Sequence, residues 1–195
     1  MSESAAERTP AENHRTYAAI FSGVVDSVAP DAWDAPAPVA GWAARDVVDH
    51  LVEWLPALLS SGSDVVLPPG PSAAEDPAAA WAHHRDAVQA LLEDPATTER
   101  ILTNPHLGAL PVDRAIDQFY TSDVLLHAWD LARATGQEVD LGEERCAAML
   151  AGMEPLDQML RESGQYGPKV DVPADASAQD RLMGFIGRDP SFTAG

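Results

Sequence analysis

The sequence is short of basic residues and of cysteine, and both shortages exclude classes of protein. Its 195 residues include 12 Lys and Arg against 31 Asp and Glu, which gives a formal net charge of −19. So acidic a chain repels phosphate backbones and anionic lipid headgroups, and we expect no nucleic-acid or membrane partner. The single cysteine, Cys146, has no second cysteine with which to form an internal disulfide. Its isolation favours a reducing compartment.

Long apolar runs and targeting segments are also missing. No run approaches the ~18 apolar residues that span a bilayer, and the start MSESAAERTPAENH lacks the basic and apolar stretches of a secretory signal. We therefore expect a cytoplasmic protein. The alternation of apolar and polar residues that marks half-buried strands is nearly absent too, so the chain is predicted to be mainly helical.

The apolar residues recur at helical spacing in several long segments. The length fits one domain, which we place at residues 11–195, after a disordered segment at residues 1–10. Helices are expected at about 10–29, 42–60, 76–92, 111–135 and 142–163, with a short last helix at about 177–186. The third of these begins either with a capping box at Ser72 and Glu75 or with Asp76 as N-cap before Pro77. Gly136 can adopt the left-handed conformation that often ends a helix, so it is expected to end the helix at 111–135. The pattern predicts an all-α helical bundle.

The helix expected at 111–135 carries two polar residues within its apolar stripe. Asp123 and His127 are four residues apart and project side by side. A carboxylate placed in a core needs a donor, a cation or a metal. His50, at the edge of the apolar face of the second helix, is the candidate third ligand. Two imidazoles and a carboxylate suit Zn²⁺, Ni²⁺ or Fe²⁺ and leave coordination positions open. On spacing alone, an internal Asp/His ion pair without metal is the preferred interpretation.

The remaining candidates have simpler interpretations. Asp130 and Arg133, three residues apart, suit an intrahelical ion pair. His14 and His106 are expected at the surface, and one of the adjacent pair His83 and His84 is expected to face solvent. Cys146 lies on an apolar helix face, where a buried structural thiol is the preferred interpretation over a nucleophile.

Three segments resemble a known family. Residues 42–51, WAARDVVDHL, resemble the W-x-x-R-D-x-x-x-H-L segment of the mycothiol-dependent maleylpyruvate isomerase branch of the DinB-like metal-binding superfamily. Residues 123–136, DVLLHAWDLARATG, are similar to the H-x-W-D-L-A-R-A-T-G signature of a single-domain, actinobacterial-type metal-binding branch of that group. The tail at 172–190 also resembles that branch, and the likeness covers about residues 17–192.

The resemblance implies a DinB-like four-helix bundle with an additional short C-terminal helix. It also implies a divalent metal at one end of the bundle, held by the matching positions His50, Asp123 and His127. The isomerase has Glu where this chain has Asp123, and it carries a separate C-terminal domain. The likeness therefore extends to fold and ligands and not to that substrate.

From the open three-ligand site and the resemblance we predict a metal-dependent S-transferase or thiol-assisted isomerase. It would use a small thiol, mycothiol, on a small electrophile, with zinc as the expected metal and nickel or iron as alternatives. Tyr120 and Asp130 are candidate active-site residues that orient the ligands, and Arg133 is the candidate for recognising a substrate carboxylate. The alternative is a non-catalytic, metal-dependent small-molecule binding protein. Monomer and homodimer both remain open.

Overall fold

A computed structural model describes residues 8–105, 108–162 and 164–194. These residues form two compact units, one within Met1–Val28 and Arg45–Ala128 and the other within Ala29–Ala44 and Trp129–Gly195. Helices dominate both units, so the prediction of an all-α fold is confirmed. Residues 1–7 of the segment expected to be disordered lie outside the described residues. Across the described ranges, no helix combines the length and apolar character that a membrane crossing requires.

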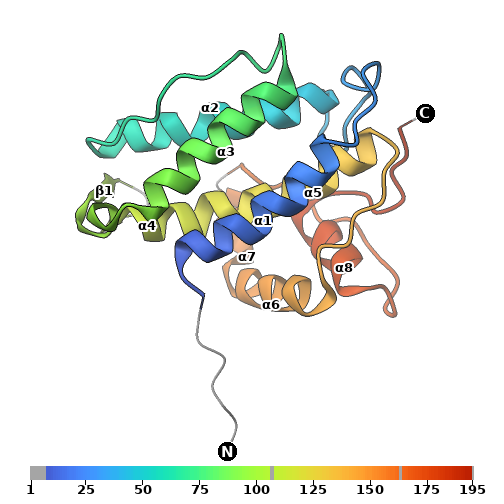
Figure 1. Ribbon diagram of the computed structural model, residues 1–195. Coiled ribbons are helices and arrows are strands. Elements are labelled where there is room, and N and C mark those ends of the chain that lie inside the picture. The colour runs from blue at the N-terminus through green and yellow to red at the C-terminus, as the bar shows by residue number, and fades with distance from the viewer. Residues whose placement is uncertain (1–7, 106–107, 163, 195) are drawn as a thin grey trace, which may run out of the picture. The chain divides into compact units, whose positions relative to one another are not determined.

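The first unit is a DinB-like helical bundle, and Figure 1 shows α1 and α3 side by side in it. Its long elements are α1 (Pro10–Val25), α2 (Ala44–Gly62), α3 (Pro77–Glu93) and a helical run of α4 (Val112–Ala115), η2 (Ile116–Thr121) and α5 (Ser122–Ala134). All of them supply large buried side chains; examples are Phe21, Leu51, Leu55, Trp81, Ile116 and Leu125. The boundary with the second unit falls inside α5, after Ala128.

Side-chain caps determine where α1 and α3 begin. The Thr9 hydroxyl accepts from the Glu12 backbone N–H, and the Glu12 carboxylate accepts from the Thr9 N–H at 2.8 Å, which completes a capping box before Pro10. In α3 the Asp76 carboxylate accepts from the Ala79 N–H at 3.0 Å. Asp76 is therefore the N-cap of α3, and the alternative that used Ser72 is wrong.

The helical run that leads to α5 contains a π-turn. Residues 116–121 adopt the wider π conformation between two α-helical stretches. We predicted one continuous α-helix from Pro111 to Thr135, so the interior of that prediction is wrong. A π-turn holds one extra residue and leaves the apolar spacing on either side unchanged, which hides it from a periodicity argument. The predicted end is confirmed, since Gly136 is left-handed with φ of 69° and the Gln137 N–H bonds to Ala132 O at 2.8 Å.

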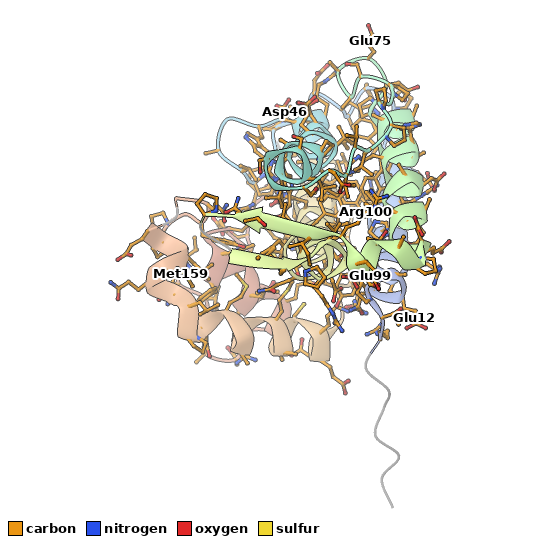
Figure 2. All side chains as sticks on the ribbon, turned by 90° about the vertical axis from the view of Figure 1, so that its left-hand side faces the viewer. Glu12, Asp46, Glu75, Glu99, Arg100 and Met159 are labelled. Carbon is orange, nitrogen blue, oxygen red and sulfur yellow. The ribbon has the colours of Figure 1, made fainter. Side chains whose placement is uncertain are left out.

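A short hairpin precedes this run and was not predicted. Strand β1 (Ile101–Asn104) pairs antiparallel with β2 (Gly108–Pro111), with Leu102 opposite Leu110. Figure 2 shows the hairpin on the side that faces the viewer and labels Glu99 and Arg100, the two residues that precede β1. They close the 3₁₀ turn η1 (Pro95–Glu99) and lead into β1. Four residues per strand give too few alternations for a sequence pattern to reveal.

The second unit contains α6 (Glu143–Met153), the 3₁₀ turn η3 (Glu154–Leu156), α7 (Asp157–Glu162) and α8 (Ala178–Ile186). We predicted one helix over 142–163, and this is wrong because Pro155 lacks the N–H that a helix interior requires. The predicted last helix is confirmed, with Ser177 as its N-cap. Cys146 is buried on α6. Desolvation is the main cause that raises the pKa of its thiol to about 11, as expected of a structural thiol.

Candidate metal centre

Helices α2 and α5 bring together the three residues predicted as metal ligands. His50 lies on α2, and Asp123 and His127 lie one turn apart on α5. His50 Nε2 is 3.1 Å from Asp123 Oδ2, and His127 Nε2 is 3.5 Å from Asp123 Oδ1. The two imidazole rings meet edge to face with centroids 4.9 Å apart. One ligand atom from each residue therefore lies within 4.8 Å of the other two.

These separations suit a shared metal ion. Atoms bound at about 2.0–2.1 Å to one ion at a tetrahedral angle lie about 3.4 Å from each other. The His50 nitrogen lies 3.1 Å from Asp123 Oδ2 and the His127 nitrogen lies 3.5 Å from Asp123 Oδ1, so each imidazole is near that separation from one oxygen of the carboxylate. Two imidazole nitrogens and one carboxylate oxygen are ligands that zinc, nickel and ferrous iron accept. The residues present thus fit a divalent metal and leave at least one coordination position for another ligand.

A fourth residue, Trp54, holds the carboxylate and was missed as part of the site by sequence reasoning. Its indole Nε1–H donates to Asp123 Oδ2 at 3.0 Å, and its ring stacks near His50 with centroids 6.1 Å apart. Trp54 follows His50 by one helical turn, so it shares the face of α2 that points to the ligands. That spacing was available in the sequence, but it gives no indication that the indole N–H reaches a carboxylate on another helix. A donor that orients a ligating carboxylate also tunes the metal site.

The charge of Asp123 is favoured by its neighbours. Burial acts to raise the pKa of its carboxyl, but the charge interaction with His127 and the contacts with His50 and Trp54 outweigh it and hold that pKa below its ordinary value. The carboxylate is therefore ionised, as a metal ligand must be.

The centre is closed on one side and open on the other. The side chain of His127 is only 5% exposed, whereas those of His50 and Asp123 are 32% and 24% exposed. Solvent therefore reaches the centre at His50 and Asp123. This partial exposure distinguishes the centre from a closed structural site.

Tyr120, a predicted active-site residue, lies beside this centre in the interior. It is fully buried in the π-turn, and its ring centroid is 5.6 Å from that of Trp54. Desolvation, followed by the charge of Asp123, raises the pKa of the phenol well above its ordinary value, so the hydroxyl keeps its proton. Tyr120 contacts Trp54, which orients Asp123. The Tyr120 hydroxyl is shielded from solvent.

Asp130 and Arg133 belong to the second unit. They were predicted to pair with each other, and the structure gives each of them a different partner. Both Asp130 oxygens accept from the Arg188 guanidinium, at 2.9 and 3.0 Å, and Asp130 is fully buried. Arg133 pairs with the exposed Glu138 and lies over the Trp129 ring. The predicted intrahelical ion pair is therefore wrong. Fifty-eight residues separate Asp130 from Arg188, so helical spacing gives no indication of this pair. Roles for Asp130 and Arg133 in a reaction remain predictions.

The other histidines divide differently from what we expected. His14 is fully buried on α1, where its Nδ1 lies 2.7 Å from Gln89 Oε1, so the prediction of a surface position is wrong. The Thr9 capping box starts α1 before His14, so this residue sits within regular helix and not at a frayed end. His84 is buried, and His83 is half-buried near Pro68 O. This is close to the prediction that one of the two faces solvent. His106 lies outside the described residues.

Comparisons with known proteins agree with this geometry. Residues 14–132 match the family described as the mycothiol maleylpyruvate isomerase N-terminal domain. The chain is 30% identical over 185 residues to uncharacterized proteins of Mycobacterium tuberculosis strains H37Rv and CDC 1551 / Oshkosh, covering 92% of this chain and 97% of each relative. No solved structure gives a significant match. Because the family match spans more than half of the chain and includes all three candidate ligands, the protein belongs to the mycothiol maleylpyruvate isomerase N-terminal domain family.

Proposed function

We propose that the protein is a metal-dependent thiol S-transferase that joins mycothiol to a small electrophile. The observation that carries this proposal is the convergence of His50, Asp123 and His127 on one half-open centre. The family description, which names mycothiol, supports the choice of thiol. A thiol-assisted isomerase would use the same arrangement, with the thiol released again after the rearrangement.

The three ligands would hold a divalent cation, with zinc the expected metal. When bound, the cation would stabilise a thiolate and so lower the pKa of the thiol that binds to it. The side chains of this chain have complementary tasks. Trp54 holds one oxygen of Asp123, and the buried His127 shields the inner side of the centre from water. The open side at His50 admits the thiol and the electrophile.

The proposed reaction is a nucleophilic substitution or addition at carbon. With an alkyl chloride, the sulfur lone pair forms the new C–S bond, the C–Cl bond breaks, and the thiol proton and chloride leave to water. With an epoxide, a C–O bond breaks and the oxygen takes up a proton.

Conjugation of mycothiol to monochlorobimane tests the proposal. Protein loaded with zinc, nickel or ferrous iron is expected to form the fluorescent conjugate faster than the metal-free protein and faster than Asp123→Asn. Equal rates with all three metals and with the metal-free control would overturn the transferase. Thiol binding to the loaded protein without any product would instead identify a non-catalytic binding protein.

The indole of Trp54 provides a second test of the same centre. Trp54→Phe keeps an aromatic ring beside Tyr120 and removes the N–H that holds Asp123. Loss of such an outer partner is expected to weaken metal binding by about 10–100-fold. Competition with a zinc-sensitive dye measures the affinity. Trp42→Phe, on the segment before α2, is the matched control and is expected to keep the affinity of the unaltered protein.

A further inference from the structure

A second group of polar side chains is buried in the first unit, next to the metal centre. His14 on α1, His84 on α3 and Tyr120 in the π-turn come from three separate elements and are 0%, 6% and 0% exposed. The Tyr120 ring centroid lies 6.3 Å from that of His14 and 5.6 Å from that of His84. Tyr120 is therefore the common neighbour of both imidazoles.

Each of these residues has one shielded polar atom that needs a partner. His14 Nε2, His84 Nε2 and Tyr120 Oη are inaccessible to solvent and have no hydrogen-bond partner among the described residues. Protein interiors leave few polar atoms in this condition, because each would lose its hydration without compensation. Three such atoms occur together on Tyr120 and its two neighbouring imidazoles. They point to a bound molecule with which they hydrogen-bond.

The hydrogen-bond network identifies which kind of partner two of these atoms require. The Gln89 amide nitrogen donates to Ala11 O and to Glu93, so Gln89 Oε1 is the acceptor that faces His14 Nδ1. His14 therefore carries its proton on Nδ1. Burial lowers its pKa, so the ring is neutral and Nε2 is an acceptor. The Tyr120 hydroxyl keeps its proton and is a donor. The bound molecule must donate to His14 and accept from Tyr120.

We propose that His14, His84 and Tyr120 form a closed binding site for an internal water molecule. Water both donates and accepts, and buried waters typically make about three hydrogen bonds to otherwise unpartnered groups. The low exposure of the three side chains argues against a larger ligand. The water would fix the Tyr120 ring, which packs against Trp54, the residue that holds Asp123. Tyr120 is thus a positioning residue, whichever reaction the metal centre performs.

The sign of a stability change tests the water site in metal-free protein. If water bridges the three residues, Tyr120→Phe removes satisfied hydrogen bonds, and the melting temperature is expected to fall by about 3–8 °C. If the hydroxyl has no partner, the same substitution removes a desolvation cost, and the melting temperature stays or rises, which would overturn the proposal. Tyr17→Phe, at a half-buried tyrosine of α1, is the control and is expected to shift it by less than about 2 °C.

A high-resolution crystal structure of the unaltered, metal-free protein provides the second measurement. We expect a density peak within hydrogen-bond distance of both His14 Nε2 and Tyr120 Oη. A direct bond between those two atoms, or empty space between them, would overturn the proposal. This measurement needs no variant, and metal-free protein separates its outcome from that of the proposed transferase.

Discussion

His127→Ala is expected to abolish stoichiometric metal binding. His127 is the buried member of the candidate centre, and alanine would leave only His50 and Asp123 to hold an ion there. The loss should exceed the 10–100-fold weakening that removal of an outer partner causes. Metal content by mass spectrometry is the measurement, on protein purified without a chelator or a polyhistidine tag. One ion per chain is expected in the unaltered protein and close to none in the variant.

The controls separate ligand loss from general damage. His83→Ala removes a half-buried histidine of the same unit and is expected to keep the full metal content. Asp123→Asn keeps the shape of the side chain and removes its charge, so weaker binding is expected, with the metal still detectable at saturating concentration. Equal metal loss in the His127 and His83 variants would show that the ion is bound elsewhere.

Arg188→Ala is expected to have the largest effect on stability. Arg188 donates two hydrogen bonds to Asp130, whose carboxylate is fully buried. Removing one partner of a buried ion pair leaves an uncompensated charge and costs about 3–5 kcal/mol. For a chain of this length we expect the melting temperature to fall by roughly 10 °C, measured by circular dichroism.

Two further variants distinguish the cause of that loss. Arg188→Met combined with Asp130→Leu removes both charges and is expected to recover most of the lost stability. Arg15→Ala breaks the ion pair with Glu93, in which both side chains are more than half exposed, and is expected to leave the melting temperature nearly unchanged. A double variant as unstable as Arg188→Ala would show that packing, and not the buried charge, causes the loss.

The grouping of the candidate metal ligands was predictable because their arrangement is mostly local. Asp123 and His127 share one turn of helix, and their position within an apolar stripe showed that both side chains point inward. Only His50 required a relation between distant segments; its place at the edge of an apolar helix face made it the candidate, and the W-x-x-R-D-x-x-x-H-L likeness supported it. The helix terminator at Gly136 was predictable for the same reason, since it depends on residues within one turn.

The features that were missed depend on contacts between distant residues. Arg188 meets Asp130 across 58 positions, and the indole of Trp54 meets Asp123 across 69, which no periodicity records. Burial of His14 follows from packing of α1 against its neighbours, whereas its sequence position near the N-terminus suggested a frayed end. Pro155 is the exception, because its effect is local and the apolar stripe alone led us to extend the helix through it.

The wider turn of η2 keeps Asp123 and His127 pointing toward His50. If the same residues 116–121 closed as a regular α-helix, α5 would turn by about 100° about its axis relative to α4, because the wider turn would no longer absorb the extra residue. Both side chains would then point away from His50 while every donor atom was still present in the chain. A relative that has all three residues and no π-turn is therefore expected to bind metal only if it also lacks one residue in this segment.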